Sequence, residues 1–168
     1  MERLRIGFTG KLPYRMRLSI QIKIWVMDTL LYYPHRPINV VTGINSGMEL
    51  FVARCAMELR KARKDVHLTI VIPDKTFSNY IQQIKCGHEL TKKQTVIAAA
   101  DEIRVIPGCF PAIVQIDRDR LIVSESDILG CCFTKRYNTD GITRNLISLI
   151  DHSPKVEVFN LMDVVKQQ

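Results

Sequence analysis

The chain has 168 residues, 46% of them hydrophobic, which suits the core of one compact domain and makes two independent domains unexpected. Its 24 basic residues outnumber its 17 acidic residues, and the net charge of +7 favours an anionic partner: a nucleotide, a nucleic acid or a membrane surface. The longest apolar segment, residues 20–33, is interrupted by Gln21, Lys23 and Asp28, so no membrane-spanning segment is predicted.

Short apolar runs rich in β-branched residues alternate with longer segments of helical spacing. The runs predict strands at residues 4–9, 38–42, 66–72, 103–106, 128–133 and 156–159. Helical spacing predicts helices within 16–31, from Gly47 through Leu59, at 92–100 and at 142–151. This alternation indicates a single α/β domain over residues 1–168, with helices on both faces of a mostly parallel sheet.

The segment 16–31 carries two patterns. Residues 16–24 alternate between apolar and polar types as a half-buried strand does, whereas Ile20, Ile24, Met27 and Leu31 have helical spacing. We predict a helix, because a crossover has to link the two parallel strands on either side of it.

Two of the predicted strands finish with the same dipeptide, Thr9-Gly10 in the first and Thr42-Gly43 in the second. In an open α/β sheet, the carboxyl ends of neighbouring strands frame the ligand crevice. We therefore expect both endings, together with Lys11 just beyond the first, to face one ligand.

The loop after Thr42 passes through Gly43, Asn45, Ser46 and Gly47 into a helix, which is typical of a ligand-binding strand-loop-helix unit. Free N–H groups at the start of a helix favour an anion, although the same turn also occurs without a ligand. The loop matches neither the P-loop nor the Gly-x-Gly-x-x-Gly fingerprint. Glu49 either stabilises the helix dipole or contacts a ribose hydroxyl or a glycosidic centre, since a phosphate there would be repelled.

The helix that begins at Gly47 has an apolar face and a polar face. A basic cluster lies mostly at its far end, and we interpret it as a solvated face; its members are Arg54, Arg60, Lys61, Arg63 and Lys64.

A third polar loop, residues 134–144, precedes the last predicted helix. Gly141, Thr143 and Arg144 form a candidate phosphate cradle. The alternative is a polar loop in which Thr139 or Asp140 serves only as the helix N-cap.

Cysteine and histidine give no sign of a metal site or another cofactor. The five cysteines contain no Cys-x-x-Cys pair and the four histidines are scattered, so no metal or cofactor is predicted. Cys131 and Cys132 lie in an apolar run, where cysteine acts as a small hydrophobic residue. We expect a reducing, cytoplasmic setting.

With these loops in view, the chain resembles the YpsA-like branch of the SLOG superfamily, which also includes DNA-processing protein A and the Lonely Guy phosphoribohydrolases. The matching segments are 6–10, 41–43, 47–51, 53–59, 68–73, 127–129 and 141–143. The resemblance implies a Rossmann-like sandwich and a nucleotide-derived ligand, and it allows a homodimer. Two departures weaken a hydrolase assignment: Lys11 stands where branch members commonly have histidine, and residues 140–145 lack the Pro-Gly-Gly-x-Gly-Thr-x-x-Glu motif.

Three functions follow from these observations. The leading one is a cytoplasmic protein, a sensor among other options, that binds a nucleotide or a nucleotide-derived ligand. The second is an N-glycosidic hydrolase or transferase that uses Glu49, with Asp74 or Asp140 as the candidate second carboxylate. The third is a single-stranded DNA-binding protein that uses the basic residues Arg3, Arg5, Lys11, Arg15 and Arg17.

Overall fold

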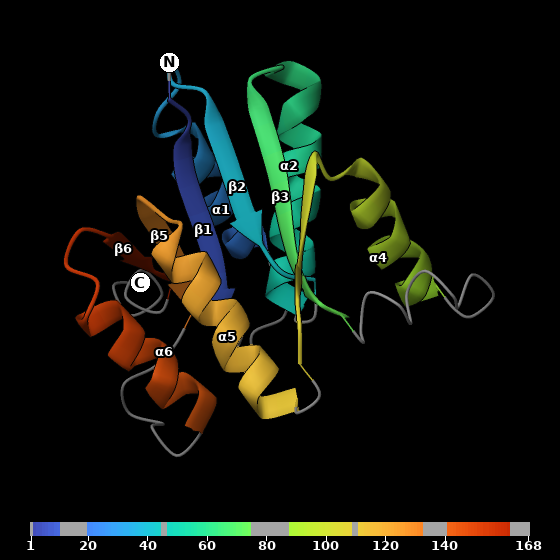
Figure 1. Cartoon of the computed structure of the whole chain (residues 1–168). Coiled ribbons are helices and arrows are strands. Elements are labelled where there is room, and N and C mark those ends of the chain that lie inside the picture. The colour runs from blue at the N-terminus through green and yellow to red at the C-terminus, as the bar shows by residue number, and fades with distance from the viewer. Residues whose placement is uncertain are drawn as a thin grey trace.

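The computed structural model describes residues 2–10, 20–44, 47–74, 88–108, 111–132 and 141–161, and its strands form one parallel sheet (Figure 1). The strands are β1 (Leu4–Gly10), β2 (Ile38–Thr42), β3 (Val66–Pro73), β4 (Glu102–Ile106), β5 (Ile128–Cys132) and β6 (Glu157–Asn160). The helices are α1 (Ile20–Leu31), α2 (Gly47–Ala62), α4 (His88–Ala99), α5 (Pro111–Ser124) and α6 (Gly141–Asp151). The α/β class and the Rossmann-like three-layer arrangement are thus confirmed.

All six predicted strands are present, and each of their bounds agrees with the prediction to within one residue. The ambiguous segment is helical from Ile20 to Leu31, and its residues 16–19 lie outside the described part of the chain. Ile22, Val26 and Leu30 recur at four-residue intervals and are all fully buried, which is why this segment folds as a helix. The helix α5 was not predicted.

The strand order of the sheet is β4-β3-β2-β1-β5-β6. From β1 to β4 the chain adds strands on one side, and it then returns to place β5 beside β1 on the other side. The order therefore reverses between β1 and β5. In open α/β sheets this reversal, at the carboxyl ends of the strands, is where ligands bind.

Two helical layers cover the sheet, and neighbouring residues of β1 show which helix lies on which face. Phe8 packs edge-on against Trp25 of α1, with ring centroids 5.8 Å apart, whereas Thr9 points the other way and hydrogen bonds to Asp119 of α5. The helix α2 contacts α1 and α4, and α5 contacts α6. Figure 1 shows α5 and α6 on the near side of the sheet and α1 and α2 behind it.

Each layer has its own apolar core. The larger core lies under α1, α2 and α4, and the smaller one lies under α5 and α6, around Val41, Val71 and Ile122. Among the described residues, no helix is both long enough and apolar enough to cross a membrane.

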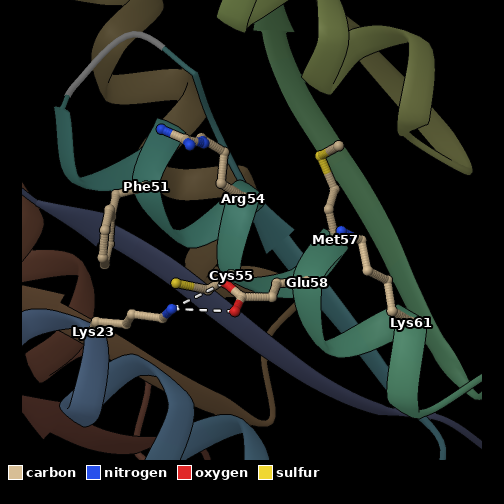
Figure 2. Close-up of a pocket in the computed structure, with 7 residues that line it drawn as sticks. All are labelled: Lys23, Phe51, Arg54, Cys55, Met57, Glu58 and Lys61. Carbon is tan, nitrogen blue, oxygen red and sulfur yellow. Dashed lines mark hydrogen bonds and ion pairs between the residues drawn. The ribbon is translucent and has the colours of Figure 1, made fainter.

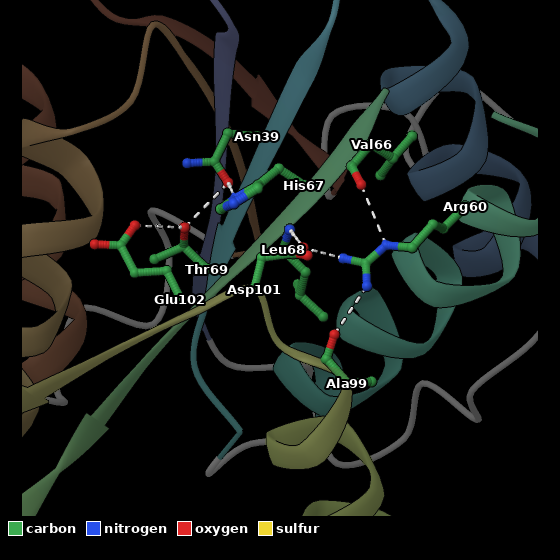
Figure 3. Close-up of polar contacts among 9 residues, drawn as sticks. All are labelled: Asn39, Arg60, Val66, His67, Leu68, Thr69, Ala99, Asp101 and Glu102. Carbon is green, nitrogen blue, oxygen red and sulfur yellow. Dashed lines mark hydrogen bonds and ion pairs between the residues drawn. The ribbon is translucent and has the colours of Figure 1, made fainter. Parts of the chain in front are cut away.

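The prediction that the basic cluster of α2 is a solvated face is wrong for Arg60. Its guanidinium donates to the carbonyl oxygens of Val66, at 3.2 Å, and Ala99, at 2.8 Å, and forms an ion pair with Asp101 (Figure 3). Asp101 in turn accepts a hydrogen bond from the backbone N–H of Leu68. Arg60 therefore ties the last turn of α2 to β3 and to the end of α4, because these carbonyl groups need a donor.

The prediction of a solvated face is also wrong for Arg63. It forms a bidentate pair with Asp65, at 2.9 and 2.8 Å, and donates to the carbonyl oxygens of Tyr33 and Arg36. Arg54, Lys61 and Lys64 are exposed, in agreement with the prediction.

Candidate ligand crevice at the carboxyl ends of the strands

The structure brings the two Thr-Gly endings together at the reversal of strand order. β1 and β2 are neighbours, with Phe8 paired to Thr42, and the Thr42 hydroxyl donates to the Phe8 carbonyl oxygen at 3.2 Å. Thr9 and Thr42 are both fully buried. Their ligand-binding role stays a prediction.

Gly10 lies where β1 comes closest to the end of β5. It has a φ of +120°, and a Cβ atom added there would lie 2.7 Å from the carbonyl oxygen of Cys132 and 2.9 Å from its nitrogen. Only glycine avoids both the backbone strain and this collision. Gly10 thus holds the two strands close at the carboxyl edge.

A buried ionic network lies beside these strand ends. Arg118 of α5 contacts both carboxylate oxygens of Glu49, at 2.8 and 3.3 Å, and one oxygen of Asp119, at 3.1 Å. The Thr9 hydroxyl donates to that same Asp119 oxygen at 2.8 Å. Arg118 is 1% exposed and Glu49 0%, so these charges interact in a medium of low dielectric.

The network crosses the edge of the sheet. Glu49 belongs to the first turn of α2, on one face, and Arg118 belongs to α5, on the other face. Such buried charges carry a large desolvation cost, and replacing them with apolar residues often leaves stability unchanged or improved.

The Glu49 carboxylate lies directly over Gly43. A Cβ atom added to Gly43 would lie 2.7 and 3.2 Å from the two Glu49 oxygens. The absence of a side chain at Gly43 therefore makes room for the carboxylate of Glu49 in the first turn of α2.

Sequence analysis missed Arg118 and Asp119. The signal was a charge in the middle of an apolar stripe: Arg118 lies four residues after Val114 and four before Ile122, and both of these are buried. A charge at that position of a core-facing helix indicates a buried ion pair.

The predicted phosphate residues lie at the start of α6. Gly141 and Arg144 are exposed, and Thr143 is half-buried. A Cβ added to Gly141 would meet nothing within 4 Å, and the Asn145 side chain donates to the Gly141 carbonyl oxygen at 2.9 Å. Within the part of the chain that the structure describes, the side chains of Thr143 and Arg144 form no hydrogen bond or ion pair.

Several predicted residues cannot be placed. Lys11, Asn45 and Ser46 lie outside the described residues, as does Asp140, which was one candidate second carboxylate. The other candidate, Asp74, is exposed at the end of β3.

Of the five predicted DNA-binding residues, two are described. Arg3 is exposed, and Arg5 pairs with Asp127 at 3.4 Å. Both line a cavity of about 610 Å³ at the amino ends of β1 and β2, opposite the carboxyl ends of these strands, and Glu2 and Asp65 add negative charge to it.

A further cavity, of about 420 Å³, lies along α2 beyond its first turn (Figure 2). Lys23 of α1 reaches Glu58 across it, at 3.1 Å, and Arg54 and Lys61 add two more cations to its lining. Cys55 also lines it, and burial raises the pKa of this thiol to about 11. A thiol with that pKa stays protonated at neutral pH, so it is a poor nucleophile.

No cluster of metal-ligating side chains occurs among the described residues. Comparison with known proteins adds no assignment: no protein-family model matches the chain, and a search of curated proteins gives no match.

Proposed function

We propose that this chain binds a nucleotide or a nucleotide-derived ligand in the crevice above the carboxyl ends of β1, β2 and β5, as a cytoplasmic member of the SLOG superfamily would. The observation that carries the proposal is the buried network of Glu49, Arg118 and Asp119 at the reversal of strand order. A fold has little reason to bury three charges at this position for stability alone.

The charges of the crevice suggest how such a ligand would lie. The network holds two carboxylates and one cation, so the region near Glu49 suits hydroxyl or amino donors of a ribose or a base. The start of α6 carries the positive end of the helix dipole and the exposed Arg144, which suit a phosphate. The ligand would thus direct its nucleoside part to β1 and β2 and its phosphate to α6.

Thermal unfolding against a panel of nucleotides, cyclic nucleotides, NAD and ADP-ribose tests the proposal. A ligand at about 100 times its dissociation constant should add about 2.7 kcal/mol, or about 5–11 °C in the midpoint. Arg144→Ala should weaken binding of phosphorylated members by about 1.5–3 kcal/mol. The control is Arg120→Ala, which removes an exposed arginine of α5 and should change no affinity.

If no member of the panel raises the midpoint, the small-molecule proposal fails. If a hit binds equally well to the Arg144→Ala variant, the phosphate does not lie at α6.

A second function, N-glycosidic hydrolysis or transfer, is favoured by one specific observation. Glu49 and Asp119 each place a carboxylate oxygen on the same Arg118 nitrogen, at 2.8 and 3.1 Å, so the two carboxylates lie close together. Paired carboxylates are the groups that stabilise an oxocarbenium centre and activate water. Asp119 therefore replaces Asp74 and Asp140 as the candidate partner of Glu49.

Base release from nucleoside monophosphates, followed by chromatography, tests this second function. Water would add to the anomeric carbon while the base leaves with a proton, and both Glu49→Gln and Asp119→Asn should slow the release. Release at the same rate in wild type and both variants, or none in any of them, would remove the enzymatic function.

A further inference from the structure

A second polar surface lies at the amino ends of β1, β2 and β3, opposite the proposed crevice. Val41 and Val71 pack in the core under α5 and α6, so residues two and four positions before them face that same side of the sheet. The strand register places Arg5 beside Asn39, and Asn39 beside His67. Arg5 and Asn39 of this polar row line the cavity of about 610 Å³.

The Asn39 amide of this row has a nitrogen that the described part of the chain does not use. Its oxygen lies 3.2 Å from the Nδ1 atom of His67 and accepts a hydrogen bond from the Thr69 hydroxyl at 3.1 Å. Figure 3 shows the nitrogen pointing away from both partners. Since that nitrogen forms no hydrogen bond with any described residue, its two N–H donors are available to a ligand in the cavity.

Arg5 adds a cation whose donors are mostly unused. A guanidinium group has five N–H donors, yet the one side-chain contact that Arg5 makes with a described residue is to Asp127, at 3.4 Å. The Arg5 side chain is 43% exposed. A guanidinium group and an amide nitrogen on the wall of one cavity suit the oxygens of a carboxylate.

Two carboxylates of the same cavity limit which anions fit. Glu2 and Asp65 balance the two arginines of the lining, so its formal charges sum to zero. Asp65 is held by Arg63, at 2.9 and 2.8 Å, and the exposed Glu2 has no ion pair within the described ranges. Carboxylate oxygens accept more than one hydrogen bond each, so both groups can receive an ammonium. A phosphate dianion would face these two carboxylates, whereas a molecule with one carboxylate and one ammonium matches the lining.

We propose that this cavity binds a small zwitterion of the α-amino acid class. The ligand carboxylate contacts the Arg5 guanidinium and the Asn39 amide nitrogen. Its ammonium group lies toward Glu2 and Asp65. The site is at the opposite end of the strands from the nucleotide crevice, and the proposal does not depend on that crevice.

Calorimetric titration of the full chain with a panel of free L-amino acids tests the proposal. The best member should bind with a Kd below about 1 mM. Its N-acetyl derivative lacks the ammonium group and its amide derivative lacks the carboxylate, so each should bind at least about tenfold more weakly. A panel without such binding, or a derivative that binds as well as the amino acid, would overturn the proposal.

Two substitutions locate the site. Asn39→Asp keeps the shape of the side chain and one oxygen for Thr69, but it replaces the amide donor with an oxygen that repels the ligand carboxylate. Arg5→Met removes the cation that pairs with the same carboxylate. Each should lower the affinity at least about tenfold. The matched control is Arg36→Met, because Arg36 is exposed and does not line the cavity, and its affinity should be unchanged.

The two variants make the test independent of a folding defect in either one. Arg5 and Asp127 have side chains that are 43% and 40% exposed, so Arg5→Met should fold, which circular dichroism checks. Unchanged affinity in a folded Arg5→Met or Asn39→Asp chain, or an equal loss in the Arg36→Met control, would overturn the proposal.

Discussion

Replacing Arg118 with methionine should destabilise the chain more than any exposed substitution on α5. The arginine is 1% exposed and lies between the buried residues Val114 and Ile122, where a methionine side chain of similar length fits. The packing of α5 is therefore largely kept, and the change removes the positive charge from between two buried carboxylates.

The contacts of Arg118 set the expected loss in the free energy of unfolding. Arg118 makes three contacts with carboxylate oxygens, at 2.8, 3.3 and 3.1 Å, and Glu49 and Asp119 are 0% and 3% exposed. Removing one partner of a buried ion pair costs about 3–5 kcal/mol, because the remaining charge stays buried. We expect a loss in this range, and a smaller loss when Glu49→Gln and Asp119→Asn accompany the change.

Urea unfolding followed by circular dichroism measures the loss. Arg120→Met is the matched control: Arg120 lies two residues further along α5, its side chain is 62% exposed, and it pairs only with Asp117 of its own helix in the described structure. The control should change the free energy of unfolding by less than about 0.5 kcal/mol. The reasoning is refuted if Arg118→Met costs less than about 1 kcal/mol with an unchanged m-value.

Three further predictions concern stability. Gly10→Ala should lower the free energy of unfolding by about 1–3 kcal/mol, because Gly10 has a φ of +120°. Gly141→Ala, whose added Cβ meets no neighbour, should have little effect in the same urea assay, and equal losses in the two variants would contradict the prediction. Burial raises the pKa of Cys55 to about 11 and that of Cys132 to about 12, above the ordinary 9.0, so above pH 9 only the unfolded thiols ionise. From pH 9 to 11 stability should fall by about 1.4 kcal/mol per pH unit for each thiol, and a double Cys→Ala variant that shows the same slope would disprove it. Arg60→Ala should cost about 1.5–3 kcal/mol in urea unfolding, since it removes a donor from two carbonyl oxygens and the cation from Asp101. An unchanged midpoint would show that water replaces the guanidinium group.

The strands and most helices were predictable because their residues act locally. Runs of β-branched residues such as 66–72 form strands that are buried on both faces, and the residues that end β1 and β2 mark the carboxyl edge of the sheet. The three-layer arrangement then follows from the alternation of strands and helices.

The helix α5 and the ionic network were not predictable in this way. Arg118 and Asp119 interrupt the apolar stripe of α5, so the helical periodicity of its sequence is weak. Arg118 and Glu49 are 69 positions apart, and their contact depends on how α5 crosses back over the sheet to reach β5. Spacing along the chain carries no information about that crossing.

Arg60 shows a similar limit. Basic residues near the end of a helix usually lie in solvent, and only the neighbouring end of α4 and the start of β3 supply the carbonyl groups that Arg60 binds. The role of such a residue depends on tertiary neighbours.

The most direct test of the ligand crevice is an amide chemical-shift titration of the isotopically labelled protein with the best ligand of the nucleotide panel. If the ligand binds in the proposed crevice, the shifts should concentrate at the carboxyl edge of the sheet, at Thr9, Gly10, Gly43 and Cys132, and at the first turn of α6. Shifts concentrated instead at the amino ends of β1 and β2, around Arg5 and Asn39, would contradict it.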